Sequence, residues 1–436
     1  MGSPPLLFSS PSVEDSASFV GLVALGESNL FRIRLKPNSV ALDVIRRSRS
    51  LDETLRLVLR ASESCGVEEV RDLSSLEDLG VHVVACRRAN SQTDAVTFGK
   101  GLSLLEAEVG ARMEAFEFKC AEPGDLAPTA FHVEDSEFRE RARAALEDFI
   151  PLANIEREPG SGVVVVDAED IETGCRTVVP AELALRPAPP GVPRIFGSST
   201  NGLASGNTLE EASFCSLLEL IERDIWSMEL ARQRSGWVDP ASLPSEALAI
   251  RERVRARGLG ISIRSVANDY QLPFFACFIY EAECPSPSSF NGGWGCSFDP
   301  ERALMQSIME AVQGRIGMRT GARRARKPSG KDDEETRTAL LAQIQKLEDA
   351  SFTLRFGDVP RTPSAGVQSS LDALLSVLRR SHRGPVHRIV LTGRREQLQV
   401  TRVVAPGLEH YRVGRARVGQ RLREAIRKSA ESRRCV

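Results

Sequence analysis

Three segments of this chain carry the same spacing of oxygen-bearing side chains, and each has the pattern of an α-helix. In residues 107–117, 212–222 and 303–313, an Ala lies seven residues before a Glu, and a second Glu or Gln follows three residues later. Because positions i and i+3 share a helix face, each segment presents two oxygen ligands side by side. Convergence of the three helices would gather five carboxylates, for which a shared Mg²⁺ and nucleotide site is the simplest explanation. The five acids are Glu114, Glu117, Glu219, Glu222 and Glu310.

An i,i+3 pair of Glu side chains is also what an ordinary solvated helix face looks like. Here, however, the acids stand among apolar residues, such as Met113 and Phe116 in the first segment and Leu218 and Ile221 in the second. Acids surrounded by core-type residues are seldom fully buried unless they are paired or bound to a metal. The recurrence of one register three times therefore favours a binding site over a solvated face.

The composition is that of an ordinary globular protein. The chain has 436 residues, of which 42% are hydrophobic and 27% are charged, and its formal net charge is −2. This balance does not indicate a polyanion-binding surface, so we expect no nucleic-acid partner. We find no apolar run of about 18 residues and no basic region followed by an apolar core at the start. We therefore expect no membrane partner and a cytoplasmic location.

The nine cysteines and five histidines do not suggest structural zinc, because no cysteine pair has CxxC spacing and no histidine cluster accompanies them. An irregular set of cysteines suits a reducing compartment. We interpret Cys215, which stands among apolar residues, as a core side chain. The scarcity of histidine also argues against a hydrolase built on a His base.

Helical and strand patterns interleave throughout, which indicates an α/β or α+β fold with internally repeated helix and strand units. We expect a strand-rich extension at 1–44, a single catalytic unit at 45–415 and an Arg-rich tail at 416–436. Within the unit, the charged stretch 320–337 is expected to be a mobile surface loop.

The expected elements follow from hydrophobic periodicity and from turn residues. Two glycine-rich stretches, Gly99–Gly101 and Gly292–Cys296, are interpreted as turns that lead into helices. The expected helices are 50–64, 103–122, 136–149, 208–232, 300–318, 338–348 and 370–381. The expected strands are 81–86, 163–166, 261–266, 274–279, 386–392 and 399–405.

Three motifs taken together resemble the YcaO family over roughly residues 45–415. They are the GKG turn with the first helix, the NGLASGNTLEEA stretch that leads to Glu219-Leu-Ile-Glu-Arg-Asp224, and a Gly-rich step before the third helix. The middle motif is the most specific. The resemblance implies a family-specific fold around a central ATP and Mg²⁺ site without a Walker motif, and the chain indeed lacks GxxxxGK[ST].

The resemblance also implies roles for individual residues. Arg223 and Arg315 would act on the phosphates as catalytic clamps. The metal ligands would be Glu114, Glu117, Glu219 and Glu222. The nucleotide contacts would be Arg47, Thr54, Asn207, Glu211, Gln306, Glu310 and Gln313. Lys100, in a Gly-Lys-Gly turn, either contacts a phosphate or is a solvated turn residue.

The chain departs from the family pattern at several positions. Arg47 stands where the family has Lys, and Gly110 stands where the first motif often has Ser. The chain ends without the Pro-x-Pro-x-Pro tail of many azoline-forming members. Residues 401–409 instead resemble YcaO proteins that work with a TfuA partner. A precursor peptide or protein, a TfuA-like or leader-binding partner and a homodimer are therefore expected.

The implied reaction activates a peptide backbone amide, whose oxygen is phosphorylated by ATP and leaves as phosphate. A Cys, Ser or Thr side chain as nucleophile would give an azoline, and sulfide would give a thioamide. The protein would only position the partners and stabilise charge, which agrees with the lack of a Ser-His or Cys-His signature. Two alternatives stay open: an ATP-dependent amide ligase acting on a small molecule, and a non-catalytic protein that binds a peptide or a partner.

Overall fold

The computed structural model describes most of the chain beyond residue 47. The residues described are 48–124, 127–153, 155, 157–158, 160–283, 285–321, 332–363, 366–381, 384–393, 396–411 and 417–434. The chain divides into two units, 1–40 and 41–436, and the fold below is that of the second unit. The extension expected at 1–44, the charged residues 322–331 and the side chain of Arg47 lie outside the described residues.

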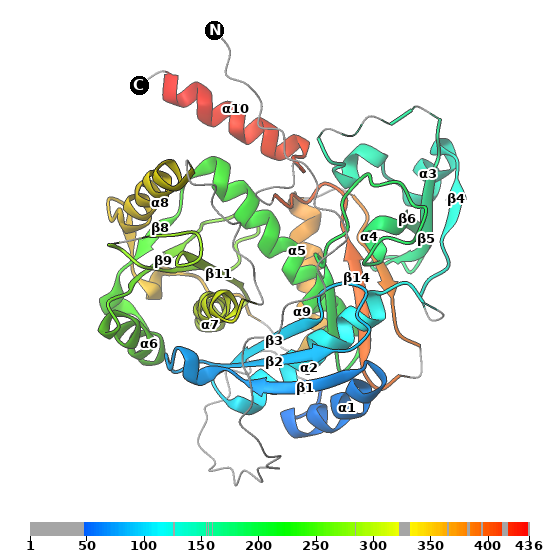
Figure 1. Ribbon diagram of the computed structural model, residues 1–436. Coiled ribbons are helices and arrows are strands. Elements are labelled where there is room, and N and C mark those ends of the chain that lie inside the picture. Colours follow the sequence, from blue (N-terminus) through cyan, green and yellow to red (C-terminus); the bar gives the residue numbers. More distant parts are fainter. Residues whose placement is uncertain are drawn as a thin grey trace. The chain divides into compact units, whose positions relative to one another are not determined.

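Three β-sheets organise the described part of the second unit (Figure 1). The first has the order β1-β2-β3, the second β11-β10-β9-β8-β12, and the third β4-β5-β13-β14-β7 with β6 paired to β5. The pair β8 and β12 is parallel, and the other described strand pairs are antiparallel. Mixed sheets with interspersed helices make this an α+β fold. The strands are β1 Val67–Asp72, β2 His82–Arg88, β3 Val96–Gly101, β4 Phe131–Val133, β5 Val163–Asp170, β6 Arg176–Pro180, β7 Leu203–Gly206, β8 Gly236–Val238, β9 Gly260–Ser265, β10 Phe274–Tyr280, β11 Asn291–Cys296, β12 Thr353–Leu354, β13 His387–Val390 and β14 Gln399–Val404.

The helices cover these sheets, and the longest of them, α5, packs against β7 and β14 and against α9 and α10 (Figure 1). Short 3₁₀ turns lie between several elements. The helices are α1 Leu51–Ser64, α2 Leu104–Ala121, α3 Asp135–Ala142, α4 Ala181–Ala184, α5 Leu209–Arg232, α6 Ser245–Ala256, α7 Pro300–Arg319, α8 Asp332–Glu348, α9 Val367–Ser381 and α10 Gln420–Arg434.

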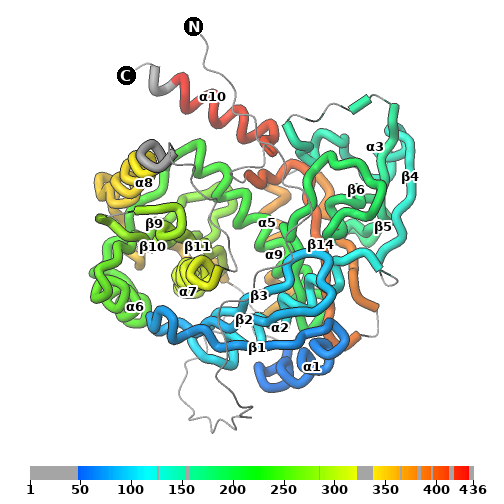
Figure 2. The backbone as a smooth tube through the Cα atoms, in the orientation of Figure 1, coloured from blue at the N-terminus to red at the C-terminus, as the bar shows by residue number. Residues whose placement is uncertain are grey.

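Each helix that carries an acidic motif begins directly after a strand and has a side-chain cap. Ser103 caps α2 in a capping box with Glu106, Thr208 caps α5, and Asp299 caps α7 with Pro300 at the first helical position. The three repeats are thus strand–helix units: β3–α2, β7–α5 and β11–α7. They come from separate stretches of the chain, as the colours of Figure 2 show.

Two large apolar clusters lie in the described part of the fold. One combines the inner residues of α5 and α9 with strand β10, and Phe274 and Leu374 are fully buried in it. The other lies beneath β5, β6 and β13, where Val165 and Val178 are fully buried. Because the first cluster joins α5 to segments that are distant in sequence, it fixes the orientation of α5, which bears the densest motif.

Several sequence-based expectations need correction. The stretch Gly292–Cys296 is a strand, β11, rather than a turn, and Lys100 lies within strand β3. The helix expected at 136–149 ends at Ala142, because Arg143 adopts a left-handed conformation with φ 52°. Residues 332–337, expected to belong to a mobile charged loop, are helical, since α8 begins at Asp332.

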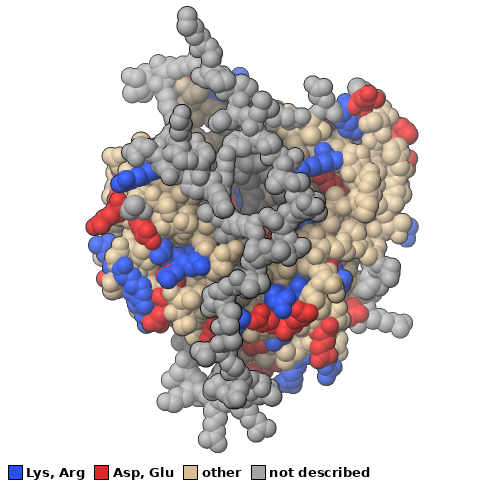
Figure 3. Space-filling view, viewed as in Figure 1, with Lys and Arg blue, Asp and Glu red and all other residues tan. Residues whose placement is uncertain are grey.

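No described helix has the length and apolar character needed to cross a membrane. On the face shown in Figure 3, the described acidic and basic side chains are intermixed rather than gathered into fields of one sign. This agrees with the net charge near zero.

Candidate active site

Glycine residues let the three motif helices pack unusually close to their own strands. A Cβ atom on Gly99 would lie 1.9 Å from the Ala107 carbonyl oxygen, and one on Gly295 would lie 2.0 Å from that of Ala303. In the middle unit, a Cβ on Gly206 would lie 2.5 Å from an α5 backbone nitrogen. The small residues of the repeated motif therefore serve packing. They bring the helix against the strand so that the acids meet the strand backbone.

The first acid of each motif accepts a hydrogen bond from the backbone just before or within the strand of its own unit. The Phe98 N–H donates to Glu114 Oε2 at 2.7 Å, and the Trp294 N–H donates to Glu310 Oε2 at 3.2 Å. Glu219 accepts from the Gly202 N–H. The spacing that the three motifs share in the sequence therefore corresponds to a shared contact, in which the first acid of each motif bonds to backbone at the strand of its own unit.

The second acid of each motif reaches across to the next unit. Glu117 on α2 accepts the Ser205 N–H at 2.8 Å and its hydroxyl at 2.6 Å, both from β7. Glu222 on α5 accepts the Cys296 N–H of β11 at 3.1 Å. Helix α7, which bears the buried Gln313, in turn packs against β3 of the first unit. The three units are thus linked in a ring, and their motif helices converge as the sequence predicted.

Arg223 stands among the acids of two units. Its guanidinium nitrogens lie 3.9 Å from Glu219, 3.8 Å from Glu222 and 3.9 Å from Glu310. Its guanidinium carbon also lies 5.7 Å from the centre of the Trp294 ring, a cation–π contact. The three carboxylates raise the pKa of Arg223. In this state the arginine balances the acids, and its contact with a phosphate remains a prediction.

Burial and mutual repulsion disfavour the ionised forms of these acids. Burial raises the pKa of Glu117 to about 8, with Glu114 and Glu219 adding to the rise. Burial likewise raises the pKa of Glu222 to about 7, although the charges of Arg223 and Lys100 oppose the rise. The pKa of Glu219 is raised for the same first reason. A cation would favour the ionised forms of all of these carboxylates.

The acids do not enclose a metal by themselves. Among the described residues, no three carboxylate, imidazole or thiolate groups stand close enough together to hold one ion. Mg²⁺ is commonly held by one or two carboxylates together with phosphate oxygens and water. The residues present fit that arrangement, in which a nucleotide completes the coordination.

A second polar group adjoins the acids and contains predicted nucleotide contacts. The Thr54 hydroxyl donates to Asn207 Oδ1 at 3.0 Å, and the Asn207 N–H donates to Glu211 Oε2 at 2.7 Å. Asn207 lies two residues after Ser205, whose hydroxyl contacts Glu117. The structure therefore joins α1, the start of α5 and the acids of α2 in one continuous polar surface.

Arg315 does not join this surface. Its Nε lies 3.1 Å from Glu77 and its Nη2 lies 3.5 Å from Glu281, and Arg319 also pairs with Glu77. Arg315 lies five positions after Glu310 along α7, so the two side chains leave different faces of the helix. In this structure the ion pairs of Arg315 are with Glu77 and Glu281, and its predicted phosphate contact stays a prediction.

Gln306 lies one turn before Glu310 on α7, and its predicted nucleotide contact stays a prediction. Cys215 was expected in the core but is exposed. It lies four residues before Glu219 and four after Glu211, on the face of α5 that carries both acids. Its place in the repeat is that of Gln306 and Gly110, and this equivalence was the signal that could have identified it.

Sequence reasoning also missed Arg402, which is 1% exposed on strand β14. The charges of Glu219 and Glu117 act on its guanidinium. An arginine in a strand that also holds Val400, Val403 and Val404 was the available signal.

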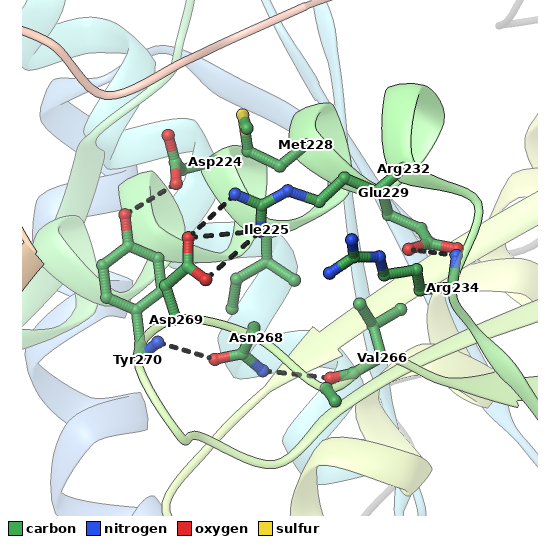
Figure 4. Close-up of a pocket in the computed structure, with 11 residues that line it drawn as sticks. Asp224, Ile225, Met228, Glu229, Arg232, Arg234, Val266, Asn268, Asp269 and Tyr270 are labelled. Atoms are coloured by element: carbon green, nitrogen blue, oxygen red, sulfur yellow. Dashed lines mark hydrogen bonds and ion pairs between the residues drawn. The ribbon is translucent and has the colours of Figure 1, made fainter. Parts of the chain in front are cut away.

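Two cavities lie away from the acids. One, of about 180 Å³, lies beside Asp224, Asn268 and Tyr270 on another face of α5 (Figure 4). The other, of about 280 Å³, lies near His132 and Phe196. Neither is lined by the predicted site residues.

The sequence model of the YcaO family, described as a cyclodehydratase that binds ATP and Mg²⁺, matches residues 98–409. An uncharacterized protein of Methanothermobacter thermautotrophicus is 29% identical over 387 residues, which are 86% of this chain and 98% of that protein. A protein encoded in the tfuA 3′ region of Rhizobium leguminosarum bv. trifolii is 29% identical over 376 residues, with coverages of 79% and 84%. These matches confirm the resemblance, and the family description agrees with the expected cofactors.

Solved structures share the fold. The YcaO protein of Methanopyrus kandleri, bound with AMPPCP and Mg²⁺, gives a TM-score of 0.69 at 23% identity and covers 87% of this chain and 97% of that one. A heterocyclase in complex with substrate and cofactor gives 0.67 at 18% identity and covers 84% of this chain and 53% of the other. The expected fold is thereby confirmed.

Proposed function

Because the chain belongs to the YcaO family, we propose that it uses ATP and Mg²⁺ to modify a backbone amide of a peptide, giving an azoline or a thioamide. The observation that carries this proposal is the ring of three strand–helix units, which brings acids of α5 and α7 around Arg223 and links Glu117 of α2 to strand β7. Like-charged groups held this way in the fold are typical of functional sites.

We assign the metal to the acids of the first two units. Glu114, Glu117, Glu219 and Glu222 would hold Mg²⁺, and their raised pKa values, where resolved, mark carboxylates that a cation would favour in the ionised form. ATP would supply the phosphoryl group that turns the amide oxygen into a good leaving group, and Mg²⁺ would neutralise its phosphates.

We assign the nucleotide to the adjoining polar surface. Thr54, Asn207 and Glu211 already form a bonded chain there, so little rearrangement is needed to contact a sugar or base. The charge of Lys100 acts on Glu222, and this supports a phosphate contact by Lys100. Gln306, Glu310 and Gln313 would complete this surface from α7.

The substrate assignment rests on the relatives. A heterocyclase with a similar fold has been solved with its substrate, and the Rhizobium relative is encoded beside tfuA. These two observations favour a precursor peptide or protein as the substrate, with a TfuA-like or leader-binding protein as the partner. They leave both products, azoline and thioamide, within the proposal.

The test combines purified protein, Mg²⁺, ATP, a candidate precursor and its partner, and reads phosphate release together with peptide mass. Loss of about 18 Da would identify cyclodehydration, and a gain of about 16 Da with added sulfide would identify thioamidation, since a water is lost or an oxygen is exchanged for sulfur. Failure to bind ATP with Mg²⁺ would contradict the site assignment.

A further inference from the structure

Arg402 is fully buried and only partly satisfied. Its Nη1 donates to the Asn201 carbonyl at 2.8 Å and its Nε to the Ala184 carbonyl at 3.3 Å. Its Nη2 is buried and has no hydrogen-bond partner among the described residues. A buried guanidinium N–H without an acceptor is unfavourable, so such a group calls for an explanation.

The backbone turn beneath Arg402 connects it to the acids. Arg402 pairs with Leu203 between β14 and β7, and the next residue, Val403, donates its N–H to the Gly202 carbonyl at 2.8 Å. The Gly202 N–H in turn donates to Glu219. The guanidinium of Arg402 and the carboxylate of Glu219 therefore both contact the turn at residues 201–202.

Arg402 is close to the acids but makes no direct ion pair with them. Burial lowers its pKa to about 10, and the charges of Glu219 and Glu117 oppose this change. No ion pair within 4.0 Å joins Arg402 to a carboxylate in the described part of the chain. Arg223 differs, because three acids surround it. The unpaired nitrogen of Arg402 is therefore left without a carboxylate partner among the described residues.

A second guanidinium approaches the same place. Arg186 stacks over Phe118, which follows Glu117, with its guanidinium carbon 5.4 Å from the ring centre. Its Nη2 donates to Asp94 at 2.7 Å, whereas its Nη1 is buried without a partner among the described residues. Arg186 follows Ala184, whose carbonyl accepts the Nε–H of Arg402, by two residues, and the charge of Arg186 also lowers the pKa of Arg402.

Two neighbouring guanidiniums, each with an unsatisfied buried donor, would be stabilised by an anion with several oxygens. We infer that Arg402 and Arg186 form an anion-binding pair beside the acidic cluster and bind the phosphoryl group that is transferred during the reaction. The inference rests on the proposed function and assigns to it two residues from outside the repeated motifs. The phosphoryl group has two sources: the terminal phosphate of ATP, or the phosphate after transfer.

Calorimetric titrations with Mg²⁺ distinguish these sources. If the pair binds the terminal phosphate of ATP, Arg402→Met will reduce the preference for AMPPCP over ADP about tenfold or more, while ADP affinity changes less than twofold. If the pair binds the phosphate after transfer, the variant will keep that preference but lose binding of inorganic phosphate to the ADP-loaded protein. Either result supports the pair.

Control variants separate binding from folding. Arg264 is another buried arginine, and its guanidinium donates to the carbonyls of Leu347 and Ser235 at 3.0 and 2.6 Å, so Arg264→Met removes comparable structural bonds far from the acids in sequence and contacts. Should Arg402→Met fail to fold, Arg186→Met gives the same test, since that side chain is 20% exposed. Arg402→Lys keeps the positive charge but loses the paired N–H donors of the guanidinium. Its results in both titrations are expected to lie between those of the wild type and of Arg402→Met.

The inference is overturned if folded Arg402→Met and Arg186→Met match the wild type in both titrations, or if Arg264→Met reproduces their change. In that case the wild type would still bind Mg²⁺ and nucleotide, and the proposed function would stand. A wild type that binds no nucleotide would overturn both.

Discussion

Helix α5 carries buried acids on two faces, and the acids of the two faces differ in the hydrogen-bond donors and cations that surround them. Asp224 is fully buried and accepts the Tyr270 hydroxyl at 2.6 Å, the Glu409 N–H at 2.7 Å and Arg421 Nη1 at 2.7 Å (Figure 4 shows the tyrosine contact). Glu222, two residues earlier, is almost as buried. Among the described residues its one hydrogen bond comes from the Cys296 N–H, and Arg223 remains at 3.8 Å.

The difference separates stability from function. The donors around Asp224 satisfy its charge and tie α5 to the loop at Tyr270 and to α10, so this acid stabilises the fold. Glu222 faces Glu219 and Glu310, and its raised pKa shows that the fold disfavours its charge. A carboxylate whose ionised form is disfavoured by the fold is expected where a cation is to be bound.

The largest effect is expected from Glu222→Gln. The amide keeps the shape but removes one negative charge from the metal site, so Mg²⁺-dependent ATP turnover should fall by about 10³-fold or more. Thermal stability should stay the same or rise, because a disfavoured buried charge is removed. Phosphate release and thermal unfolding measure the two quantities. Turnover within tenfold of the wild type would contradict the assignment.

Asp224→Asn should have the opposite effects to Glu222→Gln: a loss of stability with little change in nucleotide binding. An amide cannot satisfy Arg421 and Tyr270 as a carboxylate does, so the free energy of unfolding should fall by roughly 2–4 kcal/mol. Under conditions where the variant is folded, its affinity for Mg²⁺ and AMPPCP should change less than tenfold. Urea unfolding measures the stability and calorimetry measures the affinity. A stable Asp224→Asn variant that has lost nucleotide affinity would contradict the assignment of Asp224 to the fold rather than to the site.

The pH dependence of stability gives a third, smaller effect. Glu117 has a pKa of about 8 in the fold, against an ordinary value of 4.5. Between these values the folded state binds more protons than the unfolded state, so stability should decrease as pH rises, by on the order of a few kcal/mol.

Without Mg²⁺, unfolding measured from pH 5 to about pH 8 should therefore show a decline that Glu117→Gln makes shallower. With Mg²⁺ and nucleotide the decline should shrink, because the cation favours the ionised acids. A metal-free wild type whose stability rises across this range would show that these acids are not disfavoured as charges.

The smallest effect concerns access to the site face of α5. Cys215 is exposed between Glu211 and Glu219, whereas Cys175 is exposed at the turn between β5 and β6. Mg²⁺ with AMPPCP should slow alkylation of Cys215 several-fold and leave Cys175 unchanged. Peptide mass spectrometry after timed labelling gives both rates in one sample. Equal protection of the two cysteines, or of neither, would count against a nucleotide on this face.

Much of the site could be predicted because its spacing is local. The i,i+3 pairs and the alanine seven residues earlier are set by helix geometry, so the register of Glu114, Glu219 and Glu310 could be derived before any fold was known. The exposure of Cys215 could have been inferred from the same repeat. The apolar neighbours of Cys215 suggested a core position instead.

Other features depend on contacts between distant segments. Gly293 and Gly295 were interpreted as turn residues, but they lie in β11 because α7 packs directly on that strand. The pairing of Arg315 with Glu77 joins residues that are distant in sequence, and nothing local distinguishes it from a phosphate contact. Arg402 likewise reaches the acids only through the pairing of β14 with β7.

The most direct test of the central claim is a calorimetric titration of AMPPCP into wild type, Glu222→Gln and Asp224→Asn, each with Mg²⁺ and with a chelator. The account predicts binding that requires Mg²⁺ in the wild type, persists in folded Asp224→Asn and is lost in Glu222→Gln. Equal binding by the wild type and Glu222→Gln, or binding by the wild type that ignores Mg²⁺, would contradict it.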